Sequence, residues 1–355
     1  MALLQSTQSA PIGVGVQRDG ALSQWASRHA AILLLGAVLV FLPAVANDFI
    51  FVQVVGWAMI LGIIALSLMF LAGYGGMVSL AQMTVAGVSG YMITVFGASS
   101  LPAISLFWPW WVAAPIAIVI AVAFGTLTGV LSSRTEGIYT IMITLAIAAA
   151  FFYLTLQNWP IFNGFAGFTT IPAPIAFGIN WKHPVPLYYL ILFFAALSYA
   201  GVVYISRTPF GLALQGVRDN PRRMEAIGYN VTAHRVAAYA FAALLAAIGG
   251  ILMVWLNNQI SPGSAGIEAT IDLLVIAVVG GLGHPIGAFI GAIIYVILRT
   301  FALDSLVAIG LDGRRFQTLI GLCFLVIVLF SPDGVIGLWR RLSARARSTG
   351  GRERH

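Results

Sequence analysis

The chain has 355 residues, of which 60 % are hydrophobic and only 8 % are charged, and its formal net charge is +7. Soluble domains carry roughly 25 % charged residues, so this composition excludes a soluble globular protein and indicates an integral membrane protein. The positive charge does not indicate nucleic-acid binding, because the arginines cluster beside apolar runs, where they orient membrane spans. Membrane lipid is an expected partner, and nucleic acid is not.

Two residue types that each occur once narrow the chemistry further. The single cysteine, Cys323, rules out an intramolecular disulfide and a cysteine-based metal site. The single lysine, Lys182, is followed by His183 and not by Ser or Thr. The chain therefore lacks a Walker A loop and is not its own P-loop ATPase. We expect no enzymatic activity, no catalytic residue, no metal and no cofactor.

Apolar runs close to the ~20 residues that cross a ~30 Å hydrocarbon core as a helix recur along the chain. They lack the two-residue alternation of an outer-membrane barrel. The predicted fold class is all-α, a polytopic transmembrane helical protein of about ten spans. The predicted spans are 30–47, 51–72, 77–98, 108–131, 137–157, 187–206, 236–256, 269–283, 285–303 and 316–333.

The arginine distribution predicts the orientation of these spans. Arg18 and Arg28 place the segment 1–29 in the cytoplasm, and counting spans puts the loop 207–235 and the tail 339–355 on the same side. Both termini are thus expected to be cytoplasmic, with a membrane domain at 30–338 between them.

Glycine-rich turns open into helices in both halves of the chain, at 73–76 and at 280–283. Such a similarity between the two halves is typical of a duplicated transporter fold, so an internal repeat is expected. The second turn divides 269–303 into two segments, the first of them short or re-entrant.

Polar residues follow the first glycine turn and enter the fifth span. Groups at membrane depth face protein or a water-filled route, so these residues are candidates to line a solute pathway. Hydrogen bonding between helices is the favoured alternative for the first two of them, and packing between helices is the favoured alternative for the other three. The candidates are Ser79, Gln82, Tyr139, Thr140 and Thr144.

An acidic pair, Glu268 and Asp272, lies four residues apart near a span. An ion-coupled carrier needs a carboxylate at the membrane midplane. This pair is predicted at the outer end of a span, where water reaches it, which disfavours that role.

The loop 207–235 carries two polar residues that precede prolines, Thr208 and Asn220, and this is the pattern of a helix N-cap. Gly228 fits a helix stop. The loop therefore predicts two short helices on the inner membrane face. The second helix would either rest on lipid headgroups or insert into a groove of a partner protein.

Several motifs in order resemble the permeases of branched-chain amino acid ABC transporters, over about residues 50–340. The LivM-type subunit is the more similar of their two types. The resemblance rests on Gly73 to Ala81, Gly137-Ile138-Tyr139, Arg207-Thr208-Pro209-Phe210-Gly211, Arg218-Asp219-Asn220, Ala226 to Asn230, Val279 to Gly283, and Ser331-Pro332-Asp333-Gly334-Val335-Ile336-Gly337.

The resemblance implies one of two membrane subunits of an importer in a bacterial inner membrane. The implied partners are a LivH-like permease subunit, two ATP-binding subunits and a periplasmic substrate-binding protein. The loop would then be the element that couples ATP hydrolysis to transport. The coupling-loop residues carried over are Thr208, Pro209, Gly211, Arg218, Asp219, Asn220, Glu225, Ala226 and Gly228.

Three departures from the family pattern leave the solute open. Met77 stands where the family has glutamine, His284 replaces a small residue at a turn, and Asn163 to Phe168 lacks a threonine before its glycine. A branched-chain or related amino acid is the expected solute, with urea or a short amide as alternatives. An ion-coupled secondary carrier and a structural subunit without a transport role are the rival functions.

Overall fold

The computed structural model describes residues 36, 38–44, 46–101, 104–171, 173–176, 178–308, 321, 322, 334, 335 and 337. The chain divides into two compact units, Met1–Ala46 and Asn47–His355, and each is described by itself. In the first unit, residues 38–44 are helical. The predicted segment 1–29, most of the predicted span 316–333 and the tail 339–355 lie outside the described residues, as does Cys323.

The second unit is mostly helical. Its helices are η1 Phe49–Gly56, α2 Trp57–Met69, η2 Phe70–Tyr74, α3 Gln82–Phe96, α4 Trp110–Ser132, α5 Ile138–Gln157, α6 Trp159–Phe162, η3 Gly164–Ala166, α7 Pro184–Arg207, α8 Pro209–Asp219, α9 Pro221–Ala226, α10 Val231–Asn257, η4 Pro262–Ala265, α11 Ile267–Gly280 and α12 Ile286–Ala308. Among the described residues, the strands form two antiparallel pairs, and each strand has two residues. These pairs are β1 Phe168–Thr169 with β4 Gln259–Ile260, and β2 Ile175–Ala176 with β3 Ile179–Asn180.

Each predicted span between residues 51 and 303 forms a helix. In the described part of the chain, five helical stretches are long and apolar enough to cross a membrane. They are Phe49–Tyr74, Trp110–Ser132, Ile138–Gln157, Pro184–Arg207 and Val231–Asn257. The helices α3 and α11 are shorter, with 15 and 14 residues. The total of ten spans and the internal repeat therefore stay predictions.

The third predicted span begins later than expected, at Gln82 and not at 77. Gly76 has φ +67°, a left-handed conformation that side chains other than glycine rarely adopt. After this turn the backbone is not helical, and the N–H of Leu80 donates to the Thr144 hydroxyl at 3.1 Å. The helix is thus preceded by a non-helical segment that a neighbouring helix holds through its side chain.

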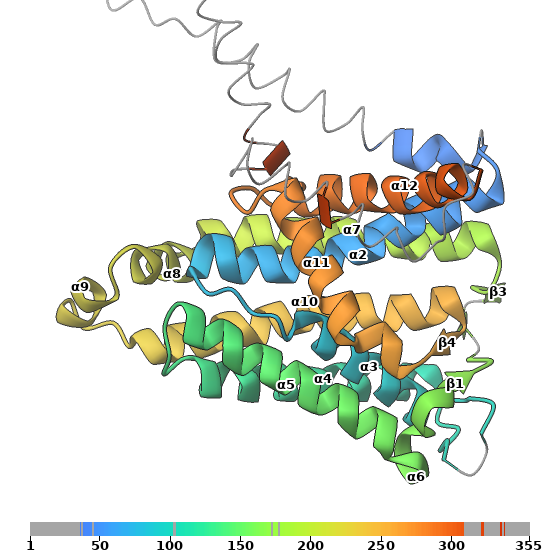
Figure 1. The fold of residues 1–355 in the computed structure, drawn as a ribbon, viewed down its shortest axis with the longest axis horizontal. Coiled ribbons are helices and arrows are strands. Elements are labelled where there is room, and N and C mark those ends of the chain that lie inside the picture. Colours follow the sequence, from blue (N-terminus) through green and yellow to red (C-terminus); the bar gives the residue numbers. More distant parts are fainter. Residues whose placement is uncertain are drawn as a thin grey trace, which may run out of the picture. The chain divides into compact units, whose positions relative to one another are not determined.

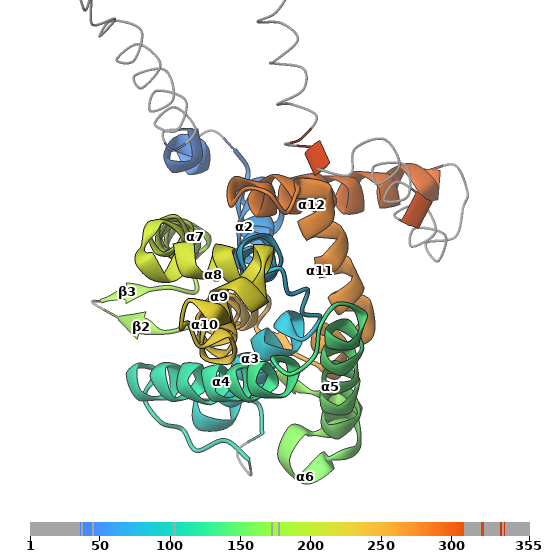
Figure 2. The ribbon, with the colours of Figure 1, turned by 90° about the vertical axis from the view of Figure 1, so that its left-hand side faces the viewer.

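The helices α2 and α10 form the centre of this unit. Helix α10 packs against α2, α3 and α4, and α2 also packs against α7, α11 and α12 (Figure 2). Small residues allow the close approach: a Cβ on Gly250 would overlap the carbonyl of Ala86, and one on Gly125 would overlap Ala243. The buried Ser89 hydroxyl adds a bond of 2.9 Å to the carbonyl of Ala247.

Helix α11 differs from its neighbours in length and direction. It runs obliquely to the longer helices (Figure 1), and its 14 residues extend about 21 Å. A turn separates it from α12, and in this turn the amide of Ile286 donates to Nδ1 of His284 at 3.3 Å. The predicted division of 269–303 into two segments, the first of them short, is confirmed.

Candidate functional site

The predicted loop between α7 and α10 forms two short helices, α8 and α9, each capped as expected. The Thr208 hydroxyl accepts from the amide of Gly211 at 3.4 Å, and Asn220 Oδ1 accepts from the amide of Arg223 at 3.0 Å. Gly228 has φ +99°. The amide of Tyr229 reaches back to the carbonyl of Met224 at 3.0 Å, which is the bond of a Schellman helix end.

Helix α8 is held firmly, whereas α9 is not. The buried residues of α8 include Leu214 and Val217, and a Cβ on Gly211 would overlap the carbonyl of Ile205. Helix α9 has no buried residue. Met224 packs back onto Gly216 of α8, while Ile227 is 64 % exposed. Met224 thus belongs to the inner contact, and Ile227 is the apolar side chain that α9 presents outward.

Arg218 connects α8 to the first glycine turn, 145 residues away in sequence. Its guanidinium donates to the carbonyl of Gly73 and to Asp219 Oδ1, the latter at 2.9 Å. Its aliphatic stem lies on Gly76, where a Cβ would stand 2.6 Å from Arg218 Cγ. The left-handed glycine therefore provides both the turn and the space for the arginine.

A second arginine, at the start of α10, contacts the α4–α5 turn. Arg235 donates to the carboxylate of Glu136 at 3.0 Å and to the carbonyl of Ser133 at 3.3 Å. The side chain of Arg235 is 12 % exposed and that of Glu136 is 69 % exposed. The contact holds the turn before α5 against the base of the α8–α9 loop.

These contacts enclose a cavity of about 290 Å³ at the α8–α9 end of the unit. The glycine turn, the α4–α5 turn, α8 and the start of α10 all contribute to its wall. Thr140 is the one candidate pathway residue that lines it. The wall residues that carry the argument are Gly76, Thr135, Thr140, Val217, Arg218 and Arg235.

The candidate pathway residues are buried with one exception. Ser79, Gln82, Thr140 and Thr144 are each at most 3 % exposed. Gln82 Oε1 accepts from the Ser67 hydroxyl at 3.1 Å, and Thr144 accepts from the amide of Leu80. Gln82 and Thr144 thus form hydrogen bonds between segments of the unit, and a role of these residues in a solute pathway stays a prediction.

Tyr139 does not lie on the buried face of α5 that carries Thr140 and Thr144. It is 66 % exposed. Consecutive helical residues point about 100° apart, so the burial of Thr140 turns its neighbour outward, away from the other candidates.

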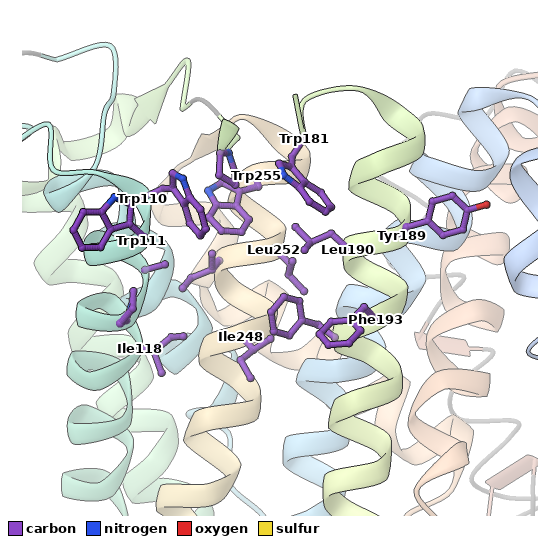
Figure 3. Close-up of a pocket in the computed structure, with 15 residues that line it drawn as sticks. Trp110, Trp111, Ile118, Trp181, Tyr189, Leu190, Phe193, Ile248, Leu252 and Trp255 are labelled. Atoms are coloured by element: carbon purple, nitrogen blue, oxygen red, sulfur yellow. The ribbon is translucent and has the colours of Figure 1, made fainter. Parts of the chain in front are cut away.

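An apolar groove that the sequence reasoning missed lies between α4, α7 and α10. Its volume is about 560 Å³, and Figure 3 shows Trp110, Trp111, Trp181 and Trp255 at one level of it. These residues lie at the ends of α4, α7 and α10 that are opposite to the α8–α9 loop. Tryptophans concentrate at the water interfaces of a bilayer, so the signal in the sequence was the placement of tryptophans at the start of α4, before α7 and near the end of α10.

The acidic pair lines a separate cavity. Glu268 and Asp272 face a polar space of about 360 Å³, together with Arg299 of α12. No group of three or more His, Cys, Asp or Glu that could hold a metal occurs in the part of the chain that the structure describes.

Comparison with known proteins identifies the family. The sequence pattern of the permease component of branched-chain amino acid transport systems matches residues 50–329. The chain belongs to this permease family. The resemblance that the motifs carry is therefore confirmed, and the chain is a multi-pass membrane protein of an ABC-type family of transport proteins.

Individual relatives extend the comparison. The chain is similar to the high-affinity branched-chain amino acid permease protein LivM of Salmonella typhimurium, with 22 % identity over 78 % of this chain and 66 % of the relative. It is also similar to a probable LivM of Methanocaldococcus jannaschii, with 25 % identity over 62 % and 67 %. The ribose import permease RbsC of Haemophilus influenzae shares 23 % over 71 % and 78 %.

The chain spans about two thirds of the length of these LivM relatives. No solved structure matches it significantly. The relatives differ in the solute that their names give, so the family fixes the permease character of the chain and leaves its solute open.

Proposed function

We propose that this permease is the LivM-type membrane subunit of an ABC importer that moves a branched-chain or related amino acid inward across a bacterial inner membrane. A LivH-like permease subunit, two ATP-binding subunits and a periplasmic substrate-binding protein would complete the transporter. The membrane domain would be 30–338, with the loop 207–235 and both termini in the cytoplasm.

The observation that carries the proposal is the contrast between α8 and α9. Helix α8 is anchored in the membrane domain, whereas α9 exposes Arg222, Arg223 and Glu225, and the residue that follows it, Ile227, is also exposed. A short, doubly capped, exposed helix on a rigid base is suited to insert into a groove of a partner. Because α9 presents charges of both signs, we expect it to bind a groove of a partner protein and not a lipid surface.

The contacts of α8 provide a route for motion from such a partner. Closure of the ATP-binding subunits would shift α9 and α8 together, and Arg218 would pass the shift to the turn at Gly73 and Gly76. That turn separates α2 from α3, and α3 is buried beside α10. Movement of packed elements between two arrangements is how alternating access operates in such proteins.

Orientation can be tested by labelling cysteines introduced into exposed positions after replacement of the native Cys323 by Ser. Glu225→Cys in α9 should react from the cytoplasmic side only. Phe165→Cys, in a side chain that is 81 % exposed at the opposite end, should react from the outer side only. The reversed pattern would contradict the proposed topology.

Coupling can be tested by uptake in proteoliposomes that hold the whole complex. ATP should drive the uptake of leucine without an ion gradient. Uptake driven by an ion gradient alone would contradict the proposal and favour the ion-coupled carrier. Gly228→Pro and Glu225→Arg should leave insertion intact and lower the solute moved per ATP hydrolysed. Transport of urea or a short amide, and not leucine, would favour the alternative solutes.

A further inference from the structure

A cavity at the end of the unit opposite to the α8–α9 loop is lined by both charged and apolar side chains. It lies between the C-terminal end of α10, the segment with β4 and η4, α11 and α12, with α2 and α3 behind. Its volume of about 360 Å³ falls in the range of roughly 300–1,000 Å³ that is usual for small-molecule sites. It is distinct from the cavity next to Arg218.

Groups of both charges line this cavity. Asp272 and Glu268 come from α11, and Arg299 comes from α12. Tyr295 is 4 % exposed, and its hydroxyl interacts with both Asp272 and Arg299. Among the described residues, no direct ion pair joins Asp272 or Glu268 to Arg299. The two signs of charge therefore face one space without neutralising each other by contact.

Part of the remaining wall is apolar and buried, and the neutral polar residues Asn257, Gln259, Ser261 and Ser264 also line the cavity. Met83 of α3, Met253 of α10 and Leu273 of α11 line the cavity and are each at most 4 % exposed. Methionine side chains adapt to the shape of an aliphatic group. The cavity thus combines an anionic group, a cationic group and an apolar surface within one small volume.

We propose that this cavity holds a zwitterionic α-amino acid with an aliphatic side chain during import. Asp272, with Glu268, would bind the ammonium group, Arg299 would bind the carboxylate, and the buried methionines and Leu273 would contact the side chain. This inference rests on the proposed function and specifies its substrate class.

The arrangement argues against the other uses of these residues. A site for a coupling cation would not place a guanidinium beside its two carboxylates, because like charges repel. Ribose and urea carry no charge, so they would not neutralise the two separated charges as an ammonium and a carboxylate group would.

Photoreactive leucine is the direct probe of the site, because its diazirine replaces part of the aliphatic side chain. Illumination of the whole complex with this probe should label α3, α10 or α11 at the cavity, and excess leucine should suppress the labelling while ribose should not. Labelling confined to other segments would overturn the inference.

Substitutions provide the second readout. Asp272→Asn and Arg299→Gln should each abolish the labelling and lower ATP-driven leucine uptake about tenfold or more, as expected for a lost charged hydrogen bond. Asp272→Glu should retain both. Asp48→Asn, at an exposed carboxylate outside the cavity, is the matched control and should behave as the wild type.

The outcomes separate the site from the proposed function. If the wild-type complex imports leucine and both variants import it equally well, the site is wrong and the function stands. If the variants also lower the unfolding midpoint and basal ATPase activity, the charges are structural and the inference fails. If the wild-type complex imports ribose or urea but not leucine, the proposed function itself is wrong.

Discussion

Replacement of Arg218 by methionine tests the proposed link between α8 and the glycine turn at 73–76. Methionine keeps an aliphatic stem over Gly76 and removes the guanidinium that donates to the carbonyl of Gly73. A hydrogen bond from a charged donor contributes about 1.5–3 kcal/mol. The Arg218 side chain is 38 % exposed, so water weakens this bond and the lower end of that range applies.

A loss of about 1.5 kcal/mol corresponds to a roughly tenfold smaller population of the state in which α8 is docked on the glycine turn. The pair between Arg218 and Asp219 adds little to this figure, because exposed ion pairs contribute only about 0–1 kcal/mol. Most of the effect of Arg218→Met should therefore come from the contact with Gly73.

The assay is the amount of leucine imported per ATP hydrolysed by the whole complex in proteoliposomes. Arg218→Met should lower this ratio several-fold while ATP hydrolysis continues. Arg134→Met removes an exposed arginine at the same end of the unit and should leave the ratio unchanged. Equal ratios for the two variants would refute the idea that Arg218 transmits motion.

Three further predictions concern the same region. Thr144→Val removes the acceptor for the Leu80 amide and should destabilise the detergent-solubilised protein by about 1–3 kcal/mol. Thr126→Val, whose hydroxyl bonds only within its own helix, is its control in the same thermal unfolding measurement. Gly211→Ala makes a Cβ overlap the carbonyl of Ile205 and should lower the free energy of unfolding by about 1–3 kcal/mol. The expected readout is faster proteolysis of the α7–α8 junction, and an unchanged rate of proteolysis would contradict the prediction. Asn220→Ala removes the N-cap of α9 and should destabilise this helix by about 1 kcal/mol. Amide hydrogen exchange should then become faster in α9 but not in α8.

The helix caps of the loop 207–235 were predictable because their signals are local. Thr208 and Asn220 each act on an amide three residues ahead, and Gly228 acts through its own backbone angle. The short helix α11 was predictable for the same reason, since the glycines after it interrupt the helical pattern. Interactions over such short sequence distances depend little on how the helices pack.

The partners of the buried polar residues were not predictable. The spacing of Tyr139, Thr140 and Thr144 is compatible with more than one face of a helix, and only the packing of α5 shows that Tyr139 points outward. The start of α3 was placed too early, because the apolar sequence after Gly76 does not reveal that Thr144 holds Leu80 out of a helix.

Composition and the order of the motifs were sufficient to establish a helical membrane protein of the branched-chain amino acid permease family, because hydropathy and short motifs are properties of consecutive residues. The tertiary structure alone brought Arg218 to the turn at Gly73, and Asp272 to one cavity with Arg299. The reason is that each pair joins residues far apart in the chain, and their approach depends on which small residues let the helices pack closely.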